Sequence, residues 1–94
     1  MSRKFIIISS GWTATQKNSL TQLLRDSPMG WSKYLNDAWF VVDSRNQHTT
    51  QSLKKLIRSE ISRNARFVIV RVESSWYSGW GPTKLWNWMS KNWN

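Results

Sequence analysis

The chain has 94 residues, of which 39% are hydrophobic and 20% charged, a composition typical of one folded domain. It carries 14 Lys and Arg against 5 Asp and Glu, so its net charge is +9, and it contains 8 Trp. The absence of Cys excludes disulfide scaffolds, thiolate metal sites and cysteine nucleophiles. No apolar run approaches the ~20 residues of a membrane span. The apolar run Phe5-Ile6-Ile7-Ile8 is also shorter than the about 7 residues of a signal-peptide core, so we expect a cytoplasmic protein without a membrane partner.

Apolar periodicity and turn residues predict four strands and three helices in the order β-α-β-β-α-β-α. The strands are runs of apolar and β-branched residues, expected at 4–9, 31–35, 38–42 and 66–72. The helices carry apolar stripes and are expected from Thr13 to Pro28, from Thr49 or Thr50 to about Ser62, and from Pro82 to Asn92. Thr13 and Gln16 have the spacing of a capping box, which marks the start of the first helix.

This order is the split βαβ arrangement of ferredoxin-like folds, extended by a C-terminal helix. We therefore predict one α+β domain over residues 1–94, a ferredoxin-like βαββαβ fold with a four-stranded antiparallel sheet. Its central strands would be the first and the third, the two that no polar residue interrupts. Two helices cover only one face of such a sheet, so its apolar second face needs another cover. The candidates are the Trp-rich helix at 82–93, a second copy of the chain, or a ligand.

Three segments carry a resemblance to a known family: the strand Lys4–Ile8, the hairpin Tyr34–Val42 and the strand Arg66–Val70. Over roughly residues 4–80, the chain resembles the small CRISPR-associated adaptation subunits and their ferredoxin-like relatives, including VapD-type toxins. The resemblance implies the fold, a homodimer and a link to antiviral defence. Many members are metal-dependent nucleases with an Asp just after the first strand. This chain has Ser9-Ser10-Gly11 there, which argues against nuclease activity.

Few residues of the chain are suited to catalysis. Asp43 and Glu73 each follow a predicted strand and are the one pair that would form a two-carboxylate metal site. His48 is the single His and lies in a polar loop without the spacing of a catalytic triad. The other carboxylates have structural roles, in the hairpin turn (Asp37), at a helix end (Asp26) and in an ion pair of Glu60 with Arg58 or Arg63. We therefore expect no enzyme, no cofactor and no metal.

Basic residues gather around the second predicted helix. Helical spacing places Lys54, Lys55 and Arg58 on its outer face; Arg45 precedes the helix, and Arg63 and Arg66 follow it. A solvated helix face is the simplest explanation of such a cluster. However, five acids cannot neutralise fourteen bases, and clustered bases in a domain of pI about 10.7 are typical of nucleic-acid binding.

The aromatic residues divide into two groups. Trp39, in mid-strand, is expected in the core, and Trp86, Trp88 and Trp93 are expected to pack the last helix onto the sheet. Trp76, Tyr77 and Trp80 lie in a Ser- and Gly-containing loop. They would either fold back on the core or form a stacking platform, where each stacked base is worth ~1–3 kcal/mol.

We therefore predict a small basic protein that binds nucleic acid, DNA or RNA. The phosphate-binding residues would be Arg45, Lys54, Lys55, Arg58, Arg63 and Arg66, and the stacking residues Trp76, Tyr77 and Trp80. Trp and Arg are also enriched at protein-binding hot spots. One alternative is thus a mobile-element or phage-type inhibitor or adaptor that binds a host defence complex. The other is a residual metal-dependent nuclease that loses its activity on Asp43→Ala.

Overall fold

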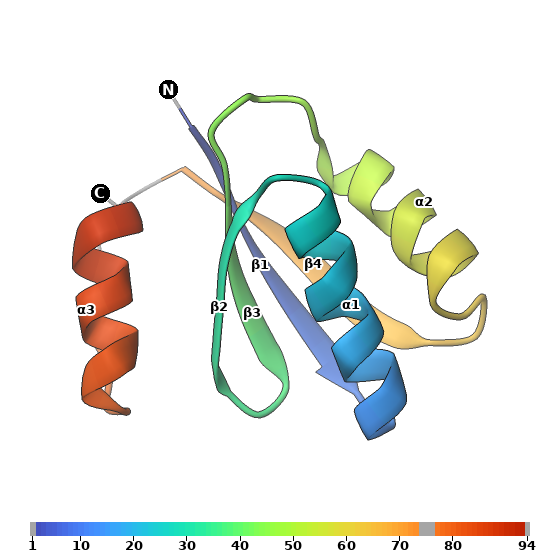
Figure 1. Ribbon diagram of the computed structural model, residues 1–94, viewed down its shortest axis with the longest axis horizontal. Coiled ribbons are helices and arrows are strands. Elements are labelled where there is room, and N and C mark those ends of the chain that lie inside the picture. The colour runs from blue at the N-terminus through green and yellow to red at the C-terminus, as the bar shows by residue number, and fades with distance from the viewer. Residues whose placement is uncertain (1, 74–76, 94) are drawn as a thin grey trace.

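The computed structural model of the chain describes residues 2–73 and 77–93. It is an α+β protein with a four-stranded antiparallel sheet and three helices (Figure 1). The strands are β1 (Arg3–Ser10), β2 (Gly30–Leu35), β3 (Ala38–Asp43) and β4 (Arg66–Val72). The helices are α1 (Ala14–Asp26), α2 (Thr50–Glu60) and α3 (Thr83–Asn92). The predicted order of elements is therefore confirmed.

The sheet has the strand order β2-β3-β1-β4, and every neighbouring pair is antiparallel. The two continuously apolar strands, β1 and β3, are central, as predicted. On β1, Ile7 lies opposite Trp39 of β3 and Ile69 of β4. The strand order and the helix placement are roughly consistent with the predicted ferredoxin-like arrangement. The two edges of the sheet are β2 and β4.

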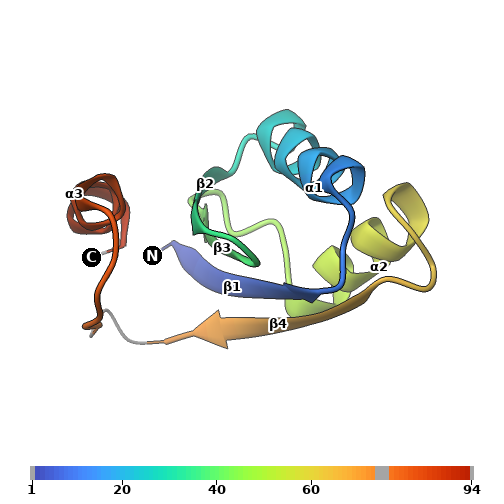
Figure 2. The ribbon, with the colours of Figure 1, turned by 90° about the horizontal axis from the view of Figure 1, so that it is seen from below.

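Helices α1 and α2 cover one face of the sheet and enclose the larger core (Figures 1 and 2). Phe5, Ile7 and Trp39 of the central strands are fully buried there. Leu20 of α1 and Ile57 of α2 pack against these three side chains from the helical layer. The predicted core position of Trp39 is confirmed.

Helix α3 lies on the opposite face and covers it in part (Figure 1). Leu85, Met89 and Trp93 are buried against Val42, with Ile6, Phe40 and Val72 packed around them. The prediction that a Trp-rich helix packs on this face is confirmed. Three apolar residues of the same face stay outside its cover, since Ile8 is 47% exposed, Val68 58% and Val70 45%. The C-terminal helix therefore covers this face of the sheet only in part.

The first strand is longer than predicted. Ser10 extends β1 one residue beyond its predicted end at Ser9, and the two serines lie opposite Arg66 and Phe67 of β4. Ser9 keeps its place because its backbone N–H donates to the carbonyl oxygen of Asp37, at 2.9 Å. The strand ends at Gly11, whose φ of 70° is in the left-handed region that glycine adopts without strain.

Ser32 of β2 offers a test of the packing beneath α3. Its side chain is 2% exposed, and its hydroxyl oxygen has no hydrogen-bond partner among the described residues. A buried hydroxyl without a partner destabilises the folded state, so we expect Ser32→Ala to raise the free energy of unfolding by about 1 kcal/mol. Urea denaturation measures the change. Ser9→Ala is the control, because the Ser9 hydroxyl donates to Asp37 O; a gain for Ser9→Ala but none for Ser32→Ala would contradict this reading.

Candidate nucleic-acid interface

Five predicted phosphate-binding residues come together on α2 and at the start of β4. We call this set the basic surface: Lys54, Lys55, Arg58, Arg63 and Arg66. All five side chains are exposed. They line two adjoining hollows of about 590 and 560 Å³, which share Lys54 and Arg58. Lys55 and Arg63 line only the first hollow, and Arg66 lines only the second.

The amphipathic character of α2 explains why its cations face outwards. Leu53 and Ile57 are buried on the sheet side of the helix, which turns Lys54, Lys55 and Arg58 towards solvent. A capping box between Thr49 and Ser52 starts the helix, with Ser in the place that Glu or Gln commonly occupies. Arg58 lies in the last turn, where a cation interacts favourably with the helix dipole.

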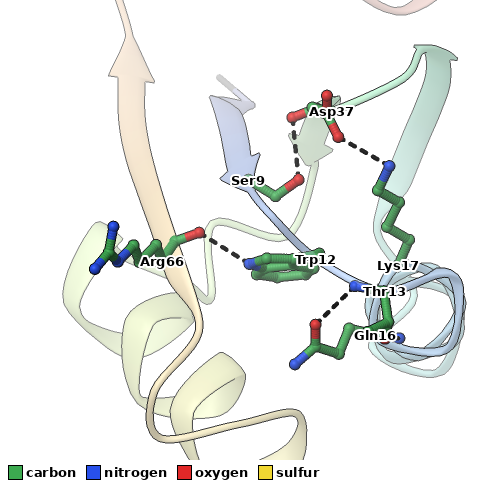
Figure 3. Close-up of polar contacts among 7 residues, drawn as sticks. All are labelled: Ser9, Trp12, Thr13, Gln16, Lys17, Asp37 and Arg66. Atoms are coloured by element: carbon green, nitrogen blue, oxygen red, sulfur yellow. Dashed lines mark hydrogen bonds and ion pairs between the residues drawn. The ribbon is translucent and has the colours of Figure 1, made fainter.

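Trp12, in the connection between β1 and α1, positions Arg66 at the start of β4. The Trp12 indole N–H donates to the backbone carbonyl of Arg66 at 2.8 Å, and the Arg66 side chain extends away from the ring (Figure 3). Trp12 is itself buried and lies 5.7 Å from the Trp39 ring. The capping box of Thr13 and Gln16 follows at once and begins α1. The backbone at the start of β4 is therefore fixed to the core, while the Arg66 guanidinium is exposed and can contact a ligand.

No member of the basic surface is neutralised by a carboxylate. Within residues 2–73 and 77–93, the ion pairs are Lys17–Asp37 at 2.9 Å and Arg71–Glu73 at 3.3 Å. The predicted pairing of Glu60 with Arg58 or Arg63 is wrong. Residues two apart on a helix do not face each other, and α2 ends at Glu60, so Arg63 does not continue its face. The basic surface thus keeps its full positive charge.

The other predicted site residues lie elsewhere. Arg45 is exposed in the turn after β3 and lines neither hollow. Tyr77 and Trp80 belong to the segment that leads into α3, and α2 and α3 lie on opposite sides of the sheet (Figures 1 and 2). Trp76 lies outside the described residues. The structure therefore gathers the cations but does not place Tyr77 and Trp80 beside them.

Trp80 is held in an exposed position by the segment around it. Its side chain is 98% exposed, whereas Tyr77 stacks on Trp86 with ring centroids 6.3 Å apart. The Trp86 indole N–H donates to the Gly81 carbonyl at 3.2 Å. A Cβ at Gly79 would lie 3.2 Å from the Trp86 ring, so glycine permits this close approach. Trp86 thus binds Gly81 and packs closely against Gly79, and the Trp80 ring between these two glycines is left in solvent.

The carboxylates considered for a metal site have other partners. Asp43 is 2% exposed, and its carboxylate accepts from the backbone N–H of His48 at 2.7 Å. Glu73 pairs with Arg71. Asp43 lies opposite Arg3 on one side of β1, while Glu73 follows the strand on the other side. In the described part of the chain, no three His, Cys, Asp or Glu residues gather where they would hold a metal.

Asp43 therefore has a structural role in the loop between β3 and α2. The Arg3 side chain also binds this loop, by donating to the His48 carbonyl at 2.8 Å. We expect Asp43→Ala to lower the free energy of unfolding by about 2 kcal/mol, because a buried charged hydrogen bond is lost. Chemical denaturation measures the loss. Asp26→Ala, at an exposed carboxylate that accepts from Gln22, is the matched control and should change stability little; equal effects would refute the assignment.

Comparison of the chain with models of known protein families, with curated proteins and with solved structures gave no match. Inference about function therefore depends on the geometry and charge described above. None of the helices in the described ranges combines the length and apolar character that crossing a bilayer requires.

Proposed function

We propose that this protein is a non-enzymatic nucleic-acid-binding protein with a ferredoxin-like fold, and that the basic surface holds the phosphate backbone. The observation that carries the proposal is the gathering of five exposed cations around two adjoining hollows without a carboxylate partner. Strand order β2-β3-β1-β4, with α1 and α2 on one face, supports the ferredoxin-like assignment.

The chemistry of the basic surface favours backbone contacts over base reading. Arg58, Arg63 and Arg66 offer planar guanidinium groups that bind phosphate oxygens in pairs, and Lys54 and Lys55 add point charges. Contacts to phosphates position a protein on nucleic acid but carry no sequence information. Binding would therefore be driven by release of counterions from the polyanion. We expect weak discrimination between sequences.

A salt series tests the proposal. Binding of a labelled single strand and of a labelled duplex is followed by fluorescence anisotropy between 50 and 200 mM salt. Five phosphate contacts predict a slope of log K against log salt of about −3.5 for the single strand and −4.5 for the duplex. Across this range the affinity should fall by about two orders of magnitude for the single strand and by nearly three, roughly 500-fold, for the duplex. Absence of binding at 50 mM salt, or an affinity that does not depend on salt, would rule the proposal out.

The position of Trp80 leads to a separate expectation about base stacking. Trp80 belongs to the segment that leads into α3, which packs on the face of the sheet opposite α2, so an oligonucleotide that lies along α2 would not contact this ring. We expect Trp80→Ala to change the affinity for a labelled octanucleotide by less than about twofold. A loss near tenfold, the size of one stacked base, would show instead that the strand crosses from α2 to the α3 side and that Trp80 stacks as the sequence suggested.

A further inference from the structure

The outer edge of β4 is available for another strand. This strand has seven residues, contains no proline, and forms the edge of the sheet beyond β1. Among the described residues, no backbone group outside β1 pairs with it. In an antiparallel pair, every second residue turns its N–H and C=O away from the neighbour. Such an edge is a template for an extended segment of another chain.

The hollow of about 560 Å³ lies along this edge, and we call it the groove beside β4. Phe67 and Val68 both line it, although successive residues of a strand point to opposite faces of the sheet. The groove is therefore lined by the edge itself, along the consecutive residues Arg66–Ile69. On the side of α2 it is lined by Lys54 and Arg58.

The other side of the same edge is apolar. Val68 and Val70 of β4 lie opposite Ile8 and Ile6 of β1, on the face that α3 covers in part. Val68 is 58% exposed, Val70 45% and Ile8 47%. A segment placed along β4 would thus meet ammonium and guanidinium groups with one set of side chains and an apolar strip with the other.

We propose that β4 accepts an extended segment of a protein partner as a fifth strand, and that acidic and apolar residues alternate in this segment. Its backbone would pair with the free edge. Its carboxylates would contact Lys54 and Arg58, and its apolar side chains would cover Val68 and Val70. The alternation follows from the period of two in a strand, since the two faces of the site differ in charge.

Charge argues for an acidic partner and against a second copy of this chain. Pairing of β4 with its own copy would bring the Lys54 and Arg58 side chains of both copies to one interface. Strand β4 also contains two Arg and no acid, and each copy carries a net charge of +9. Like charges directly opposite each other destabilise strand pairing.

This inference is independent of nucleic-acid binding. The two sites share Lys54, Arg58 and Arg66, but Lys55 and Arg63 do not line the groove beside β4. Val70 lines neither hollow, and Val68 lines only the one beside β4, where its side chain adds no charge that would hold a phosphate. Each site can therefore be removed without the other.

The experiment uses the full chain and an end-blocked, labelled peptide of eight residues in which Glu and Val alternate. We expect it to bind, and we expect hydrogen exchange of the β4 amides to slow. A peptide with the same residues in two blocks should bind at least tenfold more weakly. The double variant Val68→Thr/Val70→Thr keeps size, branching and net charge; it should weaken the alternating peptide about tenfold and leave oligonucleotide affinity within twofold.

The variant Lys55→Glu/Arg63→Glu provides the converse control, because it should reduce oligonucleotide binding and change peptide affinity by less than threefold. Equal binding of the alternating and the block peptide would overturn the proposal, since charge alone would then explain the affinity. Sedimentation that shows a dimer, lost on Val68→Thr/Val70→Thr, would also overturn it, because a second copy would then occupy the edge.

Discussion

Exchange of Lys55 and Arg63 for glutamate is expected to weaken oligonucleotide binding about a hundredfold at 50 mM salt. The double variant removes two phosphate contacts and adds two negative charges to the hollow of about 590 Å³. At this salt concentration each contact contributes roughly one order of magnitude through counterion release. The slope of log K against log salt should also become shallower, from about −3.5 to about −2 for a single strand. Anisotropy with the same labelled strand measures both quantities.

A control with the same change of charge separates this surface from the net charge. Lys84 and Lys91 are exposed on α3, on the other side of the sheet. Lys84→Glu/Lys91→Glu lowers the net charge by four, from +9 to +5, as Lys55→Glu/Arg63→Glu does. The α3 variant should retain affinity within about fivefold, because general attraction is screened beyond ~10 Å at 0.1 M salt. Equal losses in the two variants would mean that the α2 surface has no special part in binding.

The secondary structure of this chain is predictable from sequence because its signals are local. The capping box at Thr13 and Gln16 lies where the sequence places it, and the apolar runs mark β1, β3 and β4. The central place of β1 and β3 follows from their apolar character on both faces. The extension of β1 through Ser10 was missed, because the end of a strand depends on pairing with distant residues: Ser10 lies opposite Arg66 of β4, and the neighbouring Ser9 N–H donates to the Asp37 carbonyl.

The candidate site is predictable only in part, because some of its features are set by local sequence and others by contacts between distant parts of the chain. Helical periodicity brings Lys54, Lys55 and Arg58 to one face, and a short connection keeps Arg63 near them. The separation of Trp80 from these cations depends on α3, which packs on the face that α2 leaves open. Local sequence does not encode that placement. The predicted topology already puts the fourth strand at an edge of the sheet. That this edge is left uncovered was not predicted, because it depends on where α2 and α3 pack.

Trp93 is the largest side chain buried between α3 and the sheet. Its side chain is 2% exposed and meets the Phe40 ring edge-on, with centroids 5.6 Å apart. The Lys4 ammonium lies 5.7 Å from the centre of the indole and donates to the Trp93 carbonyl at 3.0 Å. Trp93→Ala removes this ring from the smaller core. We expect a loss of about 3–5 kcal/mol in the free energy of docking α3 on the sheet.

The loss should be local, because Trp93 belongs to a cluster separate from the core beneath α1 and α2. Hydrogen exchange should show that the α3 amides lose protection while those of β1 keep most of theirs. Trp80→Ala is the matched control, since it deletes the same ring at 98% exposure and should cost less than about 0.5 kcal/mol. Undocking of α3 would also uncover Ile6 and Phe40, so Trp93→Ala should bind a hydrophobic dye that the Trp80→Ala protein does not. Unchanged protection of α3 in Trp93→Ala would show that other contacts hold this helix in place.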